Sequence, residues 1–444
     1  MDTLHSKLYA LGLPEPIAVV GMGASGTMTL KVLREAGYDA FGADENKAAR
    51  HVLQCDLDDA GALRAAATMI LSPGVDSRKA AIASSHAQKI NDIELFALLN
   101  DKPVYAVTGS NGKSTVVTLL AECLRHAGKR AVLCGNIGRP VLEALFAEDA
   151  EADCYVMELS SYQLEFCPSL SPDVGAVMNV TPDHLDRYGS FIAYADAKAN
   201  LVRQADISVL NADDAFCRSM ANEARQVRWF ALGDNHAENR VEQGEFYLHN
   251  EAVMPVSALT LQGAPNHANV LAVLVMLDVI GVAPDEVRAV LETFAGLPHR
   301  MQLVAEQSGV RYINDSKATN IGAAAAALSG LTAPLHLIAG GVGKGQDFND
   351  FAKVIATSSV RHIFLIGKDN SEMQQAFAKA GLAFEDCGTM DRAVARAREV
   401  ALSGDIVLLS PATASFDQYS GFAERGQAFA YEVTTTCRPE APQP

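Results

Sequence analysis

The feature that most constrains the fold is a glycine-rich segment at residues 108–115, with the sequence Thr-Gly-Ser-Asn-Gly-Lys-Ser-Thr. The apolar run at residues 104–107 predicts a buried strand before it, and residues 116–124 predict a helix after it. A helix N-terminus after such a turn presents backbone N–H groups to a phosphate, while Lys113 adds a charge and a hydroxyl can bind Mg²⁺. A purely structural turn is the alternative, but a lysine at a helix N-terminus opposes the helix dipole unless an anion is bound.

The spacing of the glycines differs from that of the common phosphate loop, and it therefore limits the classes of ATP-binding enzyme to which the chain can belong. Two residues separate Gly109 from Gly112, and the common phosphate loop, Gly-x-x-x-x-Gly-Lys, is longer. The candidate ATP-binding residues of this loop are Gly109, Ser110, Asn111, Gly112, Lys113, Ser114 and Thr115.

Length and composition limit the possible classes of protein. A chain of 444 residues is long enough for about two to four domains. The formal net charge of −17 argues against a nucleic-acid partner, because phosphate backbones bind clustered Lys and Arg. No apolar run could cross a bilayer and no secretory signal pattern begins the sequence, so we expect a cytoplasmic protein without a membrane partner. The eight cysteines include no Cys-x-x-Cys pair, which favours reduced, buried thiols over a zinc site or disulfides.

Three segments alternate short β-branched runs with helical stretches rich in Ala and Leu, a pattern typical of parallel sheets with crossover helices. We therefore predict an α/β fold with three domains, over residues 1–98, 99–297 and 298–444. Beside the strand at 104–107, the predicted strands are residues 17–20, 131–134, 155–158, 174–179, 207–211, 310–314, 335–339, 362–366 and 406–410. Ligands bind beyond the carboxyl ends of such strands, so the polar clusters that follow them are candidate sites.

The first of these clusters is Gly21-x-Gly23-x-x-Gly26, which follows the strand at residues 17–20 and fits the dinucleotide fingerprint. Asp44 lies 18 residues beyond Gly26, near the expected end of a second strand, where an acid would bind a ribose. Taken alone, the pattern indicates an NAD dehydrogenase, and glycine turns also serve close helix packing. The second phosphate site further along the chain favours nucleotide or pyrophosphate binding over redox chemistry.

Two further strand ends carry candidate metal ligands. Glu158 ends one apolar run, and Asp183, His184 and Asp186 follow another. A carboxylate and an imidazole at one sheet edge can complete a magnesium shell around ATP phosphates, whereas a lone histidine is more often a satisfied core or surface residue. Lys198 lies on the helical stretch at residues 191–202, where the pattern alone indicates a solvated lysine.

Other polar clusters occur at residues 263–269, 297–300, 314–320, 340–345 and 410–417. Each alone is as compatible with turn or cap chemistry as with a binding site. Three of them fall after a strand of the last domain, which favours a substrate site there.

Together these motifs resemble the Mur ligase family. The resemblance rests on the loop at 108–115 and on strings at residues 135–138, 158–161, 179–181, 183–184, 296–300, 314–320 and 410–412, and it runs from about residue 15 to about residue 430. It implies a Rossmann-like N-terminal domain for the UDP end of a substrate, a central phosphate-loop ATPase domain, and a mobile Rossmann-like C-terminal domain for an amino acid.

The resemblance also implies roles for individual residues. The implied catalytic residues are Lys113, Glu158, His184, Lys198 and Lys317. Of two Mg²⁺ ions, one would be bound by Ser114 and Glu158, and the other by His184 and a carbamylated Lys198. Nucleotide-contacting positions are matched by Asn266, Arg300 and Asp315. The UDP-substrate positions are matched by Gly23, Ala24, Ser25, Asp44, Gly74, Asn136 and His184, and the glutamate positions by Thr319, Lys344, Ser415 and Phe422, with Lys317 beside them.

The chain departs from the family pattern at two places. Ala264-Pro265-Asn266 replaces Gly-x-His-Asn, which removes a histidine expected near adenine but keeps Asn266. Glu45 and Asn46 follow Asp44 where a Thr-Arg pair often helps to hold uracil or phosphate.

The resemblance implies an ATP-dependent ligase that adds D-glutamate to the L-alanyl carboxylate of UDP-N-acetylmuramoyl-L-alanine through an acyl phosphate, in peptidoglycan precursor synthesis. We expect it to act as a monomer. The residues themselves do not distinguish D-glutamate from L-glutamate as the amino acid. They also allow another ligase of the family, one that adds L-lysine or diaminopimelate, or that adds a glutamate to a folate. They also leave open an NAD enzyme and a nucleotide-binding module without turnover. Lys344 and the cluster at Ser415 favour an acidic amino acid, and the candidate metal ligands argue against a non-catalytic module.

Overall fold

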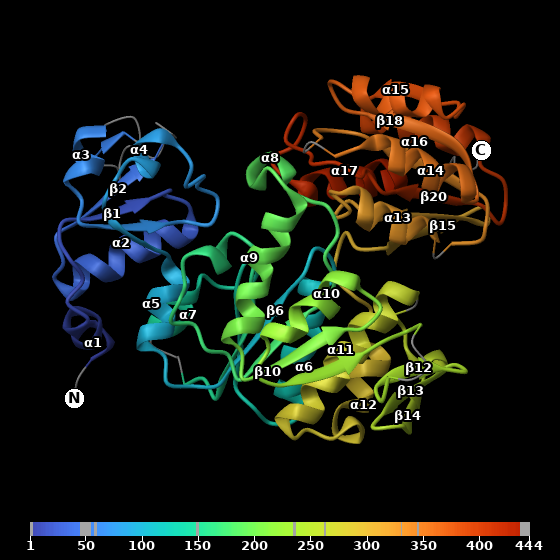
Figure 1. Ribbon diagram of the computed structural model, residues 1–444. Coiled ribbons are helices and arrows are strands. Elements are labelled where there is room, and N and C mark those ends of the chain that lie inside the picture. Colours follow the sequence, from blue (N-terminus) through green and yellow to red (C-terminus); the bar gives the residue numbers. More distant parts are fainter. Residues whose placement is uncertain are drawn as a thin grey trace, which may run out of the picture. The chain divides into compact units, whose positions relative to one another are not determined.

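The computed structural model describes residues 3–44, 55–56, 60–147, 151–233, 237–261, 263–329, 331–343 and 346–435. The chain divides into two compact units. The first comprises Met1–Val180, Ile192–Gln262 and Asn266–Phe294, and the second comprises Thr181–Phe191, Gly263–Pro265 and Ala295–Pro444. Both units contain helices packed on largely parallel sheets (Figure 1), so the predicted α/β class is confirmed.

The N-terminal part of the first unit is a five-stranded parallel sheet in the order β3-β2-β1-β4-β5. Its strands are β1 (Ile17–Val20), β2 (Ala40–Asp44), β3 (Cys55–Asp56), β4 (Thr68–Leu71) and β5 (Gln88–Ile90). The accompanying helices are α1 (Leu4–Ala10), α2 (Ala24–Ala36), α3 (Ala60–Ala65), α4 (Ala80–Ala83) and α5 (Asp92–Leu99). In the register of the sheet, Ile17 lies opposite Ala40 on β2 and Thr68 on β4. The strand order reverses at β1, and its carboxyl end is therefore the expected ligand position.

The central part of the first unit is a six-stranded parallel sheet in the order β11-β10-β9-β6-β8-β7. Its strands are β6 (Val104–Thr108), β7 (Ala131–Gly135), β8 (Cys154–Glu158), β9 (Val174–Val177), β10 (Ile207–Asn211) and β11 (Val227–Phe230). The helices here are α6 (Lys113–His126), α7 (Val141–Phe146), α9 (Phe191–Gln204), α10 (Ala215–Met220), α11 (Ala264–Ile280) and α12 (Pro284–Thr293). Each residue of β6 is buried, which places the start of the phosphate loop in the middle of the core.

One hydrophobic core is shared by these two sheets. It includes Ile17 on β1, Phe96 on α5 and Tyr155 on β8. The rings of Phe96 and Tyr155 meet edge to face with their centroids 4.9 Å apart. The predicted boundary near residue 98 therefore falls between two sheets that are packed together within one compact unit.

The second unit is built on a six-stranded sheet in the order β15-β16-β20-β17-β18-β19. Its strands are β15 (Gln302–Gln307), β16 (Val310–Asn314), β17 (Leu335–Ala339), β18 (Val360–Ile366), β19 (Glu385–Gly388) and β20 (Ile406–Leu409). The helices are α8 (Leu185–Tyr188), α13 (Ile321–Ser329), α14 (Phe348–Thr357), α15 (Ser371–Lys379), α16 (Met390–Val400) and α17 (Phe422–Thr435). The strand order reverses between β17 and β20, so the segments after these two strands border the expected ligand position.

The predicted strands are confirmed, with small differences at their ends. Four of the ten predicted strands match their observed bounds, and the other six differ by one or two residues, among them the strand expected to reach residue 179, which ends at Val177. The backbone beyond β9 leaves the sheet because Asn179 turns to the phosphate loop, where its carbonyl oxygen accepts a hydrogen bond from the Ser110 N–H over 2.9 Å.

Two antiparallel elements were missed by the prediction of parallel sheets. Strands β12 (Arg240–Glu242), β13 (Glu245–Leu248) and β14 (Glu251–Pro255) form a separate antiparallel sheet, and β15 pairs antiparallel with β16. A tight turn joins β12 to β13 in the separate sheet, where Gln243 and Gly244 both have positive φ, as is typical of a β-hairpin.

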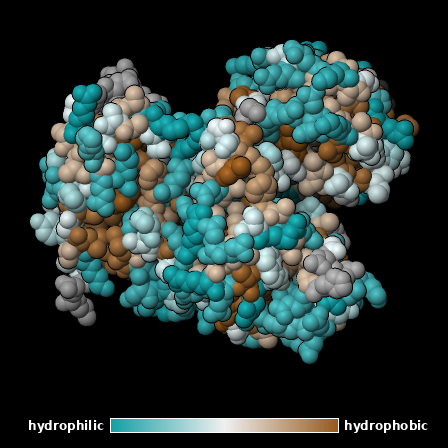
Figure 2. Space-filling view, viewed as in Figure 1, coloured by the Kyte–Doolittle hydropathy of each residue, from teal (hydrophilic) through white to brown (hydrophobic). Residues whose placement is uncertain are grey.

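The exposed surface of the protein is mostly hydrophilic on the face that Figure 2 presents. Figure 2 shows hydrophilic residues over much of the visible face, with apolar residues in smaller patches. No helix in the described part of the chain is both long and apolar enough to cross a membrane. The six cysteines at positions 123, 134, 154, 167, 217 and 387 are unpaired and buried, as predicted for reduced thiols, and burial raises the pKa of each thiol.

Candidate active site

The phosphate loop has the conformation that its sequence predicts. Strand β6 ends at Thr108 and helix α6 begins at Lys113, with Gly112 as its N-cap at φ 89° and no side chain capping the helix. A Cβ atom on Gly112 would lie 2.4 Å from Oδ1 of Asn269, so this left-handed turn accepts only glycine. The first-turn N–H groups of a long helix are thereby presented as an anion site.

Lys113 folds back over the loop. Its Nζ donates hydrogen bonds to the carbonyl oxygens of Gly109, at 2.7 Å, and Ser110, at 3.0 Å. Ser114 and Thr115 are buried at the start of α6, and the hydroxyl groups of Ser110 and Tyr194 lie 3.0 Å apart. The loop is therefore held in place by strand ends and helices on several sides before any ligand binds.

Glu158, the last residue of β8, is 1% exposed and lies beside the loop, because it pairs in register with Val107 of β6. Its Oε1 accepts a hydrogen bond from Nδ2 of Asn136 over 2.6 Å. Its Oε2 is buried and has no hydrogen-bond partner among the described residues. A buried carboxylate oxygen without a partner costs free energy, so the position fits a cation ligand.

Lys198 is buried against the same loop, and the solvated position indicated by its helical pattern is wrong. The side chain is 1% exposed, and its Nζ donates to the carbonyl oxygen of Gly109 over 2.9 Å. The Nζ also lies 4.6 Å from the centre of the Tyr194 ring. Tyr194, Lys198, Leu201 and Val202 are buried at helical spacing on one face of α9, which is the sequence signal that could have placed Lys198 inside.

His184 lies in the second unit, so its predicted grouping with Glu158 and Lys198 as metal ligands stays a prediction. It is the N-cap of α8 at φ 53°, and its backbone N–H donates to Oδ1 of Asp183 over 2.9 Å. Asp183 is 6% exposed, and its Oδ2 accepts a hydrogen bond from Nδ2 of Asn320 over 3.0 Å. Asp183 therefore joins the histidine to the polar cluster at residues 314–320.

Asn266 lies in the first turn of α11, and Asn269, one turn further on, packs against the phosphate loop. The Nδ2 of Asn269 donates to Oδ1 of Asn266 over 3.4 Å, and Asn269 is 6% exposed. The sequence predicts a contact with the nucleotide for Asn266 alone. Asn269 and Asn179 were missed because only the fold brings them to the loop, where Asn179 Oδ1 accepts the Asn111 N–H over 2.9 Å.

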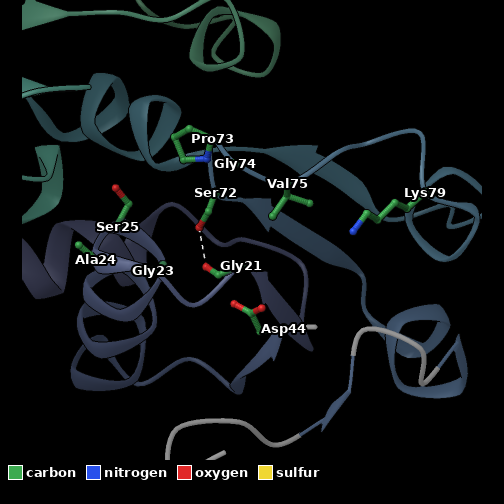
Figure 3. A pocket seen from close by; sticks show the side chains of 11 residues that line it. Gly21, Gly23, Ala24, Ser25, Asp44, Ser72, Pro73, Gly74, Val75 and Lys79 are labelled. Carbon is green, nitrogen blue, oxygen red and sulfur yellow. Dashed lines mark hydrogen bonds between the residues drawn. The ribbon is translucent and has the colours of Figure 1, made fainter. Parts of the chain in front are cut away.

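A second site surrounds the glycine turn after β1 (Figure 3). The pocket has a volume of about 360 Å³ and is lined by Gly21, Gly23, Ala24, Ser25, Gly26, Asp44, Ser72, Pro73, Gly74, Val75 and Lys79. A Cβ on Gly26 would lie 1.9 Å from the Gly21 carbonyl oxygen, and Gly23 caps α2 without a side chain. Asp44 Oδ2 accepts the Met22 N–H, and Ser72 Oγ donates to the Gly21 carbonyl oxygen over 2.6 Å.

This pocket contains most of the residues predicted to bind the UDP end of a substrate. Gly23, Ala24, Ser25, Asp44 and Gly74 line it. Asn136 and His184 do not line it, since Asn136 follows β7 of the central sheet and His184 lies in the second unit. The segment with Glu45 and Asn46 lies outside the described residues.

The candidate amino-acid site lies at the carboxyl ends of the strands of the second unit. The Nζ of Lys317 lies 3.8 Å from the centre of the Phe422 ring, and the His299 ring meets Phe422 edge to face at 6.2 Å. Thr319 donates its N–H to the Lys317 carbonyl oxygen over 2.8 Å, and Ser415 is 2% exposed in the segment after β20. Lys344 lies outside the described residues.

Asp315 follows β16 and is a buried carboxylic acid. Its Oδ2 accepts from Ser410 Oγ over 3.0 Å, and its Oδ1 accepts the Met301 N–H over 3.2 Å. Burial raises the pKa of Asp315 to about 7, and the charge of Arg300 counteracts that rise in part. Two of the predicted nucleotide contacts, Arg300 and Asp315, are thus electrostatically coupled within this unit.

Arg425 on α17 is a structural residue that sequence reasoning missed. It is 1% exposed and donates to the backbone carbonyl oxygens of Ser316, Thr413 and Ala414 at 2.9–3.3 Å. Burial lowers the pKa of its guanidinium to about 10. This side chain fastens the segments after β16 and β20 to one another, and no local motif indicates it.

Comparison with known proteins agrees with this arrangement. Residues 107–277 match the Mur ligase middle domain, and residues 299–413 match the glutamate ligase domain of Mur ligases. The chain is 39% identical over 436 residues to a protein of Chromobacterium violaceum named UDP-N-acetylmuramoylalanine–D-glutamate ligase, covering 93% of this chain and 96% of the relative. A protein of Alcanivorax borkumensis with the same name is 40% identical over 437 residues, covering 94% and 98%.

Solved structures show the same fold at lower identity. The MurF ligase of Thermotoga maritima, solved in complex with ADP, superposes with a TM-score of 0.64 at 15% identity, covering 98% of this chain and 99% of that chain. The sequence similarity over nearly the whole length is what decides the relationship. This chain belongs to the Mur ligase family.

Proposed function

We propose that this chain is an ATP-dependent ligase that adds D-glutamate to the L-alanyl carboxylate of UDP-N-acetylmuramoyl-L-alanine, acting as a monomer in cytoplasmic peptidoglycan precursor synthesis. The observation that carries the proposal is the phosphate loop with two buried side chains of opposite charge beside it, Glu158 and Lys198. The name shared by relatives at about 40% identity supports D-glutamate over the other amino acids of the family.

The chemistry requires activation of a carboxylate, because a carboxylate does not acylate an amine in water. The L-alanyl carboxylate attacks the γ-phosphate of ATP and gives an acyl phosphate and ADP. The free amine of glutamate then attacks the acyl carbon, and phosphate leaves from the tetrahedral intermediate. We assign the loop N–H groups and Lys113 to the ATP phosphates, where they offset the charge that builds up between the two anions.

The chemistry of the residues present fits Mg²⁺. The unpartnered, buried Oε2 of Glu158 suits a hard cation, and the Ser114 hydroxyl follows the loop lysine directly. We assign Ser114 and Glu158 to one ion, and His184 and Lys198 to a second. When bound, the ions would neutralise phosphate charge. Carbamylation of Lys198 would convert a cation into an anionic oxygen ligand.

The remaining roles follow from the second pocket and the second unit. We assign the pocket at Gly23, Ser25 and Asp44 to the UDP end of the substrate, and Asn136 to its muramoyl part. Asn266, Arg300 and Asp315 are assigned to the nucleotide. Thr319, Lys344, Ser415 and Phe422, with Lys317, are assigned to glutamate.

Phosphate release tests the proposal. We expect release from ATP to require Mg²⁺, UDP-N-acetylmuramoyl-L-alanine and D-glutamate together, with L-glutamate, L-lysine and diaminopimelate inactive in its place. Release that is indifferent to the UDP substrate would refute the proposal. Activity with a different amino acid would instead identify another member of the family, and a nicotinamide-dependent absorbance change would indicate redox chemistry.

A further inference from the structure

The pocket after β1 contains an electrostatic conflict for an anionic ligand. Its α2 edge offers N–H groups and the positive end of a helix dipole, worth about half a charge. Asp44, at the end of β2, places a carboxylate in the same pocket. A diphosphate brings further negative charge, and a cation at this pocket would offset part of its repulsion from Asp44.

Lys79 is the basic side chain among the residues that line the pocket. It precedes α4, at the end of the segment that follows β4, and Figure 3 shows its ammonium end directed towards the side of the pocket that holds Val75 and Asp44. Its backbone is fixed, because the Lys79 N–H donates to the Asp76 carbonyl oxygen over 3.1 Å and Ile82 and Ala83 donate to the Lys79 carbonyl. A half-buried lysine on a fixed backbone can reach a ligand at little cost in backbone entropy.

The neighbouring Arg78 differs from Lys79 in its position relative to the pocket. Arg78 is exposed and does not line the pocket. Its Nε and Nη2 donate to the two carboxylate oxygens of Asp76 at 2.9 and 2.8 Å, which directs the guanidinium to that side chain. Two adjacent cations in one segment therefore have different positions relative to the pocket, and Arg78 is a matched control for Lys79.

We propose that Lys79 binds the diphosphate of the UDP substrate, and that it supplies the positive charge that opposes Asp44 in this pocket. The proposal rests on the assignment of this pocket to the UDP end. It makes Lys79 a determinant of affinity for the diphosphate, with no part in the reaction at the distant L-alanyl carboxylate. Among the sequence neighbours of Asp44, Lys47 is the rival source of such a charge.

Calorimetric titration of the full-length protein with UDP and with uridine tests this role. We expect Lys79→Ala to weaken UDP binding about tenfold, the loss expected for one charge-assisted contact, and to leave uridine binding unchanged. Lys79→Arg should keep most of the affinity, and Arg78→Ala should bind UDP like the wild type. The affinity of Lys79→Ala should also depend less steeply on salt, because one ionic contact is lost.

The steady-state signature follows from the same role. In Lys79→Ala the KM for the UDP substrate should rise about tenfold while kcat stays within about twofold, since the contact is made equally in the ground state and the transition state. The proposal would be overturned if Lys79→Ala bound UDP with wild-type affinity. It would also be overturned if Lys47→Ala lost affinity for UDP and Lys79→Ala did not. A wild-type protein that does not bind UDP would instead overturn the assignment of the pocket, so the two failures are distinguishable.

Discussion

The ammonium group of Lys198 donates to the carbonyl oxygen of Gly109 over 2.9 Å, and the same oxygen accepts a hydrogen bond from Lys113 at 2.7 Å. Two cationic groups thus converge on one backbone oxygen of the phosphate loop, with Lys198 almost completely buried. Like charges at this separation repel, and the repulsion is relieved when phosphate oxygens lie between them or when one amine becomes an anionic carbamate.

Carbamylation of Lys198 predicts a dependence on bicarbonate. Enzyme depleted of CO₂ should release phosphate several-fold more slowly, and added bicarbonate should restore the rate. Lys198→Ala should be slow in both conditions, which separates carbamylation from a general effect of bicarbonate. Phosphate release at matched pH and ionic strength is the measurement, and an equal rate with and without bicarbonate in the wild type would exclude the carbamate.

Lys113→Ala should separate catalysis from substrate binding. The ammonium group of Lys113 is hydrogen-bonded to the phosphate loop, while the pocket assigned to UDP belongs to the N-terminal sheet. We expect turnover to fall about a thousandfold or more, because a preorganised charge at the transferred phosphate is lost. Calorimetry should show UDP binding unchanged, and near-normal turnover would remove Lys113 from its proposed role.

Glu158→Gln tests the carboxylate oxygen that lacks a partner in the described part of the chain. Glutamine keeps an oxygen to accept from Asn136, but it cannot offer a charge at the Oε2 position. The Mg²⁺ concentration for half-maximal phosphate release should rise at least about tenfold. In the absence of Mg²⁺ the variant should melt no lower than the wild type, because the buried unpaired charge is gone. An unchanged Mg²⁺ requirement would contradict the assignment.

Arg425→Met tests the buried guanidinium that joins the segments after β16 and β20. The substitution keeps much of the volume but removes the guanidinium donors from the carbonyl oxygens of Ser316, Thr413 and Ala414, of which the last still accepts the Val342 N–H. We expect a loss of roughly 3 kcal/mol in the stability of the second unit. Arg392→Met on the exposed side of α16 is the control, and thermal melting with limited proteolysis would report the difference. Equal melting of both variants would contradict the structural role.

The phosphate loop and the glycine turn after β1 could be predicted from the sequence because their geometry depends on a few adjacent residues. Gly112 is required by its own positive φ, and the strand before it is a continuous apolar run. The residues that support the loop could not be found in this way. Asn179 follows β9, Tyr194 lies on α9 and Asn269 on α11, and only the fold brings these three segments to residues 109–112.

Lys198 and Arg425 show the same limit for charged residues. A basic residue in a helix is normally solvated, and polarity alone gives no sign of burial. The helical spacing of apolar residues around Lys198 on α9 indicates its burial. Arg425 has no such signal, because the carbonyl groups that it binds, those of Thr413 and Ser316, lie 12 and 109 residues away along the chain.

Asp92→Asn should change how stability depends on pH. Asp92 begins α5, is 3% exposed, and has one carboxylate oxygen without a hydrogen-bond partner among the described residues. Burial raises the pKa of Asp92 to about 6, although a hydrogen bond from Ser25 counteracts this in part. In the unfolded chain the pKa returns to about 4.

The direction in which stability changes with pH follows from the number of protons bound in the folded and unfolded states. Between about pH 4 and pH 6 the unfolded chain holds fewer protons at this site than the folded protein does, so the contribution of Asp92 to stability is present below pH 4 and is lost as the pH rises through 6. A difference of about two pKa units corresponds to about 3 kcal/mol. The asparagine variant does not titrate. Its unfolding free energy relative to the wild type, from urea titrations at pH 4, 5, 6 and 7, should therefore rise by up to about 3 kcal/mol over this range, and parallel profiles would show that Asp92 is not the group that titrates.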